Sequence, residues 1–336
     1  MKKKLNLRVW LTYALLAAVF IAVFALVETG STSRQFKSLL VPVCINMMLA
    51  LSLNLIVGFL GELTLGHAGF MSVGAYAGCL LSVQLQDALP VAARLPIVLI
   101  FGGLVAAVFG LLIGIPVLRL KGDYLAIVTL AFGEIIRSIL LNLEFTGGAA
   151  GLRGIPRDVP NSMNSSAYLV AFGLVILTLV VVTNLVYSRH GRAITAIRDN
   201  RIAAESLGVN VTYYKLMVFV LAAFFAGMAG VLYGHNLGQV NANTFDYNRS
   251  IEILVIVVLG GMGSIPGSLI AAALITVIPE MLRSFSDYRM LAYAIVLIVA
   301  MIFNSSPKLI ELRSKYSVRK LLARRKKARQ ARKEAN

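Results

Sequence analysis

Long apolar runs separated by short polar segments are the feature that most limits what this chain can fold into. Several runs reach or exceed the roughly 20 residues that a helix needs to cross the core of a bilayer. Of the 336 residues, 58% are hydrophobic and only 14% are charged, whereas soluble domains carry about 25% charged residues. Because a helix satisfies its own backbone hydrogen bonds in lipid, the sequence predicts an all-α, polytopic integral membrane protein.

About ten membrane segments are expected, and the eighth is too short to cross as a regular helix. The segments are 10–27, 38–60, 66–85, 95–118, 124–142, 167–187, 215–236, 251–263, 265–282 and 289–303. If both basic ends of the chain lie in the cytoplasm, the number of crossings is even. Ten crossings with a turn at 263–268 satisfy this condition and place most of the 32 Lys and Arg inside. The alternative is a re-entrant eighth segment, after which the ninth does not cross fully.

The chain is expected to form one transmembrane domain, 1–305, with a polar cytoplasmic loop at 188–214 and a basic cytoplasmic tail at 306–336. A net charge of +17 raises the question of nucleic-acid binding. The basic residues gather at the two ends and in one loop, however, as is typical of topology signals. Nucleic acid is therefore not an expected partner, whereas the tail is expected to lie along anionic membrane lipid.

Pairs of small residues four positions apart predict close helix packing. These are Gly74 and Gly78, Gly110 and Gly114, Ala226 and Gly230, and Gly230 and Gly234. A glycine-lined pathway is the alternative.

The sequence carries no motif that indicates an enzyme. It has no phosphate-binding loop of the G-x-x-x-x-G-K-[ST] type, no H-E-x-x-H and no G-x-S-x-G, so any ATP hydrolysis is expected in a separate chain. Cys44 and Cys79 lie within apolar runs, and the three histidines, His67, His190 and His235, are far apart. Neither a metal site nor a cofactor is expected.

Two features within the apolar runs are candidates for function. Glu134 and Arg137 lie three residues apart in the fifth segment, on one helix face. A structural ion pair is predicted, with a pathway role for a zwitterionic solute as the alternative. The second feature is a pair of glycine-rich breaks, GFLGELTLGHAGF at 58–70 and GGMGSIPGS at 260–268.

Such breaks often line the pathway of a transporter; two tight interhelical turns are the alternative. The residues predicted to form the pathway or a hinge are Gly66, His67, Gly69, Gly260, Gly261, Gly263, Pro266 and Gly267.

The loop contains a polar stretch, RDNRIAAESLGVN at 198–210, that predicts a short helix. Asp199 or Asn200 can serve as its N-cap, Ile202–Leu207 as its body and Gly208 as its stop. Two turns of isolated helix are marginal in water, so the helix should rest against its own spans or against a partner. The small pair at Ala203 and Ala204 would let another surface approach. The alternative is a loop that is basic only to fix the topology.

Three blocks of sequence resemble the LivM-type permease of branched-chain amino-acid ABC importers. They are LNLIVGFLGELTLGHAGFMSVGAYAG, AIRDNRIAAESLGVNVTYYKLMVFVLAAFFAGMAGVLYG and VLGGMGSIPGSLIAAALI. The similarity extends over roughly residues 40–305. In ABC importer permeases, a cytoplasmic loop with an E-A-A-x-x-x-G pattern docks on the ATPase. Ala203, Ala204 and Gly208 match this pattern, whereas Ile202 stands where the pattern has Glu.

The resemblance implies that the polar helix is a coupling helix seated on a cytoplasmic ATPase. The implied coupling residues are Asn200, Ile202, Ala203, Ala204, Glu205 and Gly208. It also implies a homologous second permease, two ATPase subunits and an external, periplasmic solute-binding protein. The implied location is the bacterial inner membrane, with both termini in the cytoplasm. An importer of urea or short amides is the nearest alternative, and an ion-coupled secondary amino-acid transporter is another.

Overall fold

The computed structural model describes residues 34–120, 122–159 and 165–281, with the single positions 25 and 298. The chain divides into two compact units, 1–277 and 278–336, and nearly all described residues belong to the first. Apart from those two single positions, the predicted first and last segments lie outside the described residues, and so does the basic tail.

The long elements of the described chain are helices, as predicted. In chain order, the elements are α2 (Arg34–Asn54), the π-helical turn η1 (Leu55–Leu60), α3 (His67–Gln84), α4 (Val91–Val117), α5 (Asp123–Asn142), the 3-10 turns η2 (Glu144–Thr146) and η3 (Gly148–Ala150), β1 (Leu152–Arg153), α6 (Ser165–Val186), α7 (Arg189–Asp199), α8 (Arg201–Ser206), α9 (Val211–Leu237), β2 (Gln239–Val240), the 3-10 turn η4 (Ala242–Phe245), α10 (Tyr247–Gly260) and α11 (Ile265–Met281).

Five described helices are long and apolar enough to cross a membrane: Phe36–Leu60, Val91–Val117, Asp123–Asn142, Ala167–Val186 and Val211–Leu237. A shorter apolar helix, Ile265–Glu280, accompanies them. The prediction of an all-helical polytopic protein is therefore confirmed.

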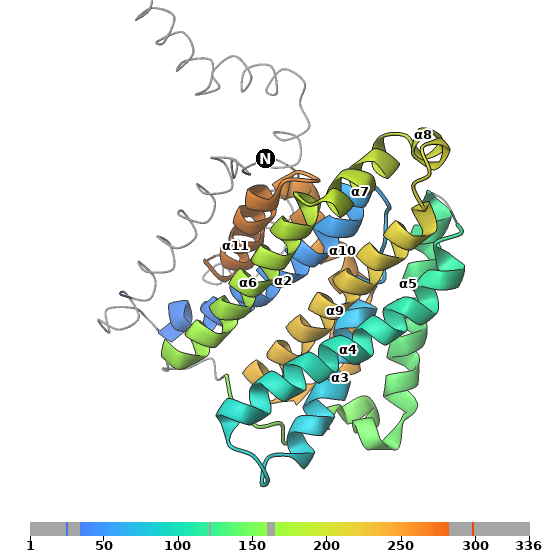
Figure 1. Cartoon of the computed structure of the whole chain (residues 1–336). Helices are drawn as coiled ribbons and strands as arrows, with labels where there is room; N and C mark the ends of the chain where they lie inside the picture. Colours follow the sequence, from blue (N-terminus) through green and yellow to red (C-terminus); the bar gives the residue numbers. More distant parts are fainter. Residues whose placement is uncertain (1–24, 26–33, 121, 160–164, 282–297, 299–336) are drawn as a thin grey trace, which may run out of the picture. The chain divides into compact units, whose positions relative to one another are not determined.

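Helices α3, α4 and α9 pack closely against one another (Figure 1). Glycines make this possible, because a Cβ at Gly74 of α3 would lie 2.2 Å from Cα of Gly227 of α9. A Cβ at Gly102 of α4 would lie 2.7 Å from the carbonyl oxygen of Gly74. Among the predicted small residues, Gly230 faces the backbone of Met71, as Gly74 faces that of Gly227. The predicted Gly110, Gly114 and Gly234 instead face side chains of α9, α9 and α3. Backbones at this distance leave no room for a side chain.

The predicted eighth segment, 251–263, differs from expectation at its start. Helix α10 begins earlier, at Tyr247, and is preceded by β2 and η4. Strand β2 pairs antiparallel with β1 in the connection between α5 and α6. The N–H of Tyr247 then contacts Glu134, in the middle of α5, and Gly263 lies against Gly58. The structure therefore places the start of α10 beside the middle of α5 and the turn after α10 beside η1.

Replacing Gly74 by Ala tests the close packing. The added methyl group would overlap the backbone of Gly227, and overpacking of this kind costs about 1–3 kcal/mol of stability. We expect a lower apparent melting temperature of the detergent-purified protein. Gly173→Ala in α6 is the matched control, because nothing lies within 4 Å of its Cβ position. Equal melting temperatures for the two variants would contradict the packing described.

Candidate functional site

The polar loop between α6 and α9 folds into two helices, α7 and α8, each with a side-chain cap. The Ser188 hydroxyl accepts from the N–H groups of His190 and Gly191 at 3.1 and 3.3 Å. Oδ1 of Asn200 accepts from the N–H of Ala203 at 3.0 Å, and Asn210 caps α9 in the same way. Gly208 follows α8 with a φ of +79°, which favours glycine. The expected short helix, its Asn200 cap and its Gly208 stop are therefore present.

Sequence reasoning missed α7. A signal was available, because Gly191, Ile194 and Ile197 recur every three residues and are buried. This spacing is that of one helix face. Helices α7 and α8 lie together beside the first residues of α9 (Figure 1).

The exposed residues of α8 and its C-cap include two large apolar side chains. The side chain of Ile202 is 76% exposed and that of Leu207, directly after the helix, is 84% exposed. Ala203 and Glu205 are exposed too, whereas Ala204 is only 3% exposed. Ala204 thus packs within this chain, and the idea that it offers a contact face to a partner is not supported. The apolar side chains of Ile202 and Leu207 are available for contact with a partner.

The two glycine-rich breaks meet at Gly58 and Gly263. A Cβ at Gly58 would lie 2.2 Å from the backbone nitrogen of Gly263. Oδ1 of Asn54 accepts from this nitrogen at 2.8 Å, while Nδ2 of Asn54 donates to the hydroxyl of Ser268 at 3.0 Å. The buried side-chain amide of Asn54 therefore forms hydrogen bonds both to the turn between α10 and α11 and to the first turn of α11. We call these residues, Asn54, Gly58, Gly263 and Ser268, the junction.

Two contacts of charged side chains connect the end of η1, next to the junction, with the polar loop and the start of α9. Nη1 of Arg198, in the last turn of α7, donates to the carbonyl oxygen of Gly58 at 3.0 Å. Lys215 in the second turn of α9 pairs with Glu62, just after η1. Both side chains of the Lys215–Glu62 pair are largely buried. No local pattern indicates either contact, since the partners lie 140 and 153 positions apart.

The other predicted hinge residues are placed at contacts near the two breaks. Gly66 and Gly69 face α5, where Cβ atoms would lie 2.4 Å from the Thr129 carbonyl oxygen and 2.9 Å from Cα of Gly133. Buried His67 contacts the Ser52 hydroxyl through Nε2 at 2.8 Å. In the second break, Gly260 and Gly267 face each other's backbone, Gly261 and Gly263 have positive φ, and Pro266 is exposed in the first turn of α11.

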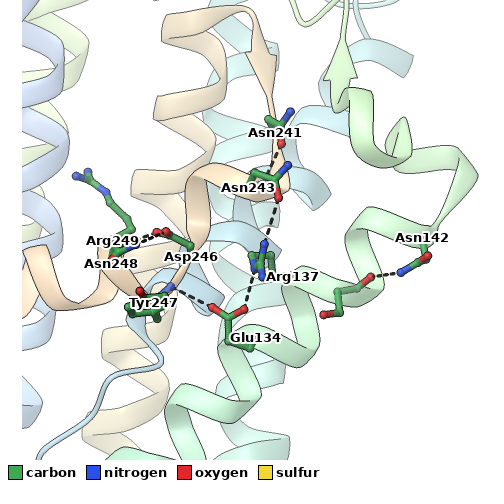
Figure 2. A network of polar contacts seen from close by, with 10 residues as sticks. Glu134, Arg137, Asn142, Asn241, Asn243, Asp246, Tyr247, Asn248 and Arg249 are labelled. Carbon is green, nitrogen blue, oxygen red and sulfur yellow. Dashed lines mark hydrogen bonds and ion pairs between the residues drawn. The ribbon is translucent and has the colours of Figure 1, made fainter.

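Glu134 and Arg137 are in contact in the middle of α5, with 2.8 Å between Oε2 and Nε. Figure 2 shows the network around them. Nη1 of Arg137 donates to Oδ1 of Asn243 at 3.2 Å. Oε1 of Glu134 accepts from the N–H of Tyr247 at 3.0 Å, at the start of α10. Both charged side chains are a little over a quarter exposed, 29% and 28%.

A buried polar cluster that sequence reasoning did not identify holds the connection between α5 and α6. Asp158 accepts from Nη2 and Nε of Arg94 at 2.5 and 3.2 Å. Nδ1 of His235 lies 3.2 Å from Oδ2 of Asp158, although its alignment is poor for a hydrogen bond. Burial alone would raise the pKa of Asp158, but the contacts with His235 and Arg94 outweigh it and hold this pKa below its ordinary value of 3.8. The carboxylate is therefore charged at neutral pH.

The comparisons with known proteins agree with this architecture. The family described as "Branched-chain amino acid transport system / permease component" matches residues 35–303. The chain belongs to this family.

Two relatives are high-affinity branched-chain amino acid transport system permease proteins LivM. That of Salmonella typhimurium (strain LT2) is 39% identical over 292 residues, which are 77% of this chain and 66% of the relative. That of Escherichia coli K12 is 37% identical over 318 residues, 85% of this chain and 72% of the relative. The chain thus spans slightly less than two thirds of the Salmonella protein. The permease protein LivH of Salmonella typhimurium is 29% identical over 144 residues, 42% of this chain and 46% of the relative. No solved structure shows significant similarity to this chain.

The resemblance to LivM-type permeases that the three sequence blocks indicated is confirmed. Family membership also agrees with the lack of enzyme motifs, because the family is one of permease components.

The ion pair of α5 makes a testable prediction. Breaking a buried pair costs about 3–5 kcal/mol, whereas replacing both partners can be nearly neutral. We expect Glu134→Gln and Arg137→Met each to lower the apparent melting temperature of the purified protein. The loss of stability should be smaller than about 3–5 kcal/mol, because the pair is partly exposed. The double variant should recover part of the loss. Unchanged melting temperatures with lost transport in both single variants would instead support a pathway role.

The Asp158 cluster predicts a pH dependence. Because the pKa of Asp158 is lower in the folded state, its contribution to stability is present above the ordinary value of 3.8 and is lost as pH falls through the folded pKa. We expect Asp158→Asn to lower the melting temperature at neutral pH. The difference from the unmodified protein should shrink below about pH 4. Asp87→Asn, at an exposed position in the α3–α4 connection, is the control and should change little at either pH. A pH-independent difference for Asp158→Asn would contradict this account.

Proposed function

We propose that this chain is the transmembrane permease subunit of an ATP-driven importer of branched-chain, hydrophobic amino acids. The observation that carries the proposal is the capped helix α8, whose apolar Ile202 and Leu207 point away from the rest of the chain. Helix α8 has six residues, and so short a helix is too weak to persist without support. Its caps and the buried Ala204 hold it in place, so that it presents an ordered apolar surface to a partner.

The partner proposed for this surface is a cytoplasmic ATPase. Coupling residues Asn200 and Gly208 shape the helix, Ala204 anchors it, and Ile202, Ala203 and Glu205 face outward together with Leu207. Closure of a pair of ATPases on ATP would press on α8 and rock the spanning helices between two states. Hydrolysis takes place in the partner, since this chain has no phosphate-binding loop.

The remaining partners follow from the family. The similarity to LivH, also a permease protein of a branched-chain amino acid transport system, supports a homologous second permease beside this one. Two ATPases and an external solute-binding protein complete the proposed assembly. The basic ends and the basic loop support a bacterial inner-membrane location with both termini in the cytoplasm.

An ion-coupled secondary transporter is less well supported. Such a mechanism needs an acid within the membrane that can take up and release the coupling ion. Within the described residues, the acid in the middle of a long apolar helix is Glu134, and it is held by Arg137 and by the N–H of Tyr247.

Charge on the outward face of α8 tests the proposal. We expect Ile202→Asp and Leu207→Asp to insert normally, because both side chains project from the fold, but to reduce ATPase retained on the tagged permease and solute uptake by about tenfold or more, the effect of losing an apolar anchor at an interface. Arg201→Ala is the control, since its exposed pair with Glu205 is worth under about 1 kcal/mol.

The uptake assay uses the full assembly, with leucine, isoleucine and valine compared with urea and acetamide. Full ATPase retention and full uptake in both Asp variants would refute docking at α8. Uptake of urea but not of leucine would refute the proposed solute class.

A further inference from the structure

Arg198 joins the end of α7 to the end of η1. Its Nη1 donates to the carbonyl oxygen of Gly58, and its Nε and Nη2 donate to Oδ1 of Asp199 at 3.1 and 3.0 Å. Its aliphatic stem lies over Gly61, where a Cβ would come within 2.5 Å of Cγ of Arg198. An arginine fork can hold two such acceptors in a fixed geometry, which lysine cannot do.

The carbonyl of Gly58 has a physical need for this donor. It lies two residues before the end of η1, and the last carbonyls of a helix lack partners from a following turn. The N–H groups of Gly61 and Glu62 both point to the carbonyl oxygen of Ile56 instead. A guanidinium provides a charge-assisted hydrogen bond, which is stronger than a neutral one. The end of α7 is therefore bound to the end of the α2–η1 helix.

The same place touches the turn between α10 and α11. A Cβ at Gly263 would lie 3.3 Å from the Gly58 carbonyl oxygen and 3.6 Å from Nη1 of Arg198. Asn54 binds this turn from the other side. A displacement of the end of α7 therefore acts directly on Gly58 and Gly263. Since α10 has only 14 residues and its first N–H binds Glu134 of α5, α10 connects the junction with the middle of α5.

We propose that Arg198 is the positioning residue that passes movement of the α7–α8 loop to the junction and, through α10, to the polar network of α5. This inference rests on the proposed function, in which a partner ATPase moves α8. It adds a specific route, from the docking surface through one guanidinium to the two glycine-rich breaks. Docking and transmission are thereby assigned to different residues: Ile202 and Leu207 dock, and Arg198 transmits.

The test uses the complete assembly of both permeases and the ATPases, with Arg198→Met in this chain. Methionine keeps an unbranched apolar stem over Gly61 but donates no hydrogen bond. We expect normal ATPase retention and continued ATP hydrolysis. Uptake of leucine should fall about tenfold, the size expected for loss of one charge-assisted hydrogen bond from the coupled state.

A chemical probe reports the transmission itself. A cysteine introduced at Met262, which is 61% exposed in the α10–α11 turn, is labelled with a maleimide with and without a non-hydrolysable ATP analogue. The native cysteines, Cys44 and Cys79, are buried. We expect the analogue to change the labelling rate in the otherwise unmodified assembly, and expect this change to disappear with Arg198→Met. A purely structural role would not remove the nucleotide response while leaving the ATPase bound.

Two matched pairs of variants separate Arg198 from general effects. Arg192→Met removes another arginine of α7, one that is exposed, and should leave uptake unchanged. Gly61→Ala would push Arg198 away, whereas Gly154→Ala, at a similar φ of +77°, has nothing within 4 Å of its Cβ position. Only Gly61→Ala should reproduce the Arg198→Met result.

The outcomes distinguish this inference from the proposed function. Normal uptake with Arg198→Met, or loss of the bound ATPase in that variant, would overturn the inference and leave α8 docking intact. A labelling rate at Met262→Cys that does not respond to nucleotide in the transporting assembly would overturn it as well. If the unmodified permease neither retains an ATPase nor supports ATP-driven uptake, the proposed function itself fails.

Discussion

The structure depends on one constraint, which is that polar backbone groups released by a broken helix in apolar surroundings must find partners. An unsatisfied group of this kind costs several kcal/mol in a membrane. The chain breaks once after η1 and once between α10 and α11, and it brings both breaks to one place. The amide of Asn54 then serves the N–H of Gly263, and the guanidinium of Arg198 serves the carbonyl of Gly58. One polar side chain thus serves each break, Asn54 the second and Arg198 the first.

Glycines have two different roles in the described chain: some allow helices to pack closely, and others lie at the breaks where helices end. Helices α3, α4 and α9 approach so closely at Gly74, Gly102 and Gly227 that backbone meets backbone. Close-packed interfaces of this kind resist gradual deformation. The breaks lie instead where α2 and α10 end, next to the polar loop. We therefore expect a movement of that loop to displace η1 and the α10–α11 turn before it displaces the closely packed helices α3, α4 and α9.

The sequence predicted local features well and long-range ones poorly, for a physical reason. The Asn200 cap and the Gly208 stop are correct because capping depends on residues within a few positions. The side of α8 that faces outward was predicted wrongly at Ala204. Apolar residues at 202, 203, 204 and 207 surround most of so short a helix, and what decides burial is packing within the fold rather than the pattern. Arg198 was missed because its importance comes from a carbonyl 140 positions away, which no local pattern records.

The charges in the middle of α5 are connected with the start of the short helix α10. Helix α10 begins beside the middle of α5. Its first N–H groups need acceptors, and the positive end of its dipole favours anions. Asp246 caps the N–H of Arg249 at 3.0 Å, and Glu134 takes the N–H of Tyr247. A carboxylate at this depth needs a counter-charge, which Arg137 provides, and Asn243 of η4 in turn holds Arg137. The ion pair, the 3-10 turn and the short helix thus form one arrangement: removing Glu134 would leave the N–H of Tyr247 without its acceptor and only Asp246 as an anion at the start of α10.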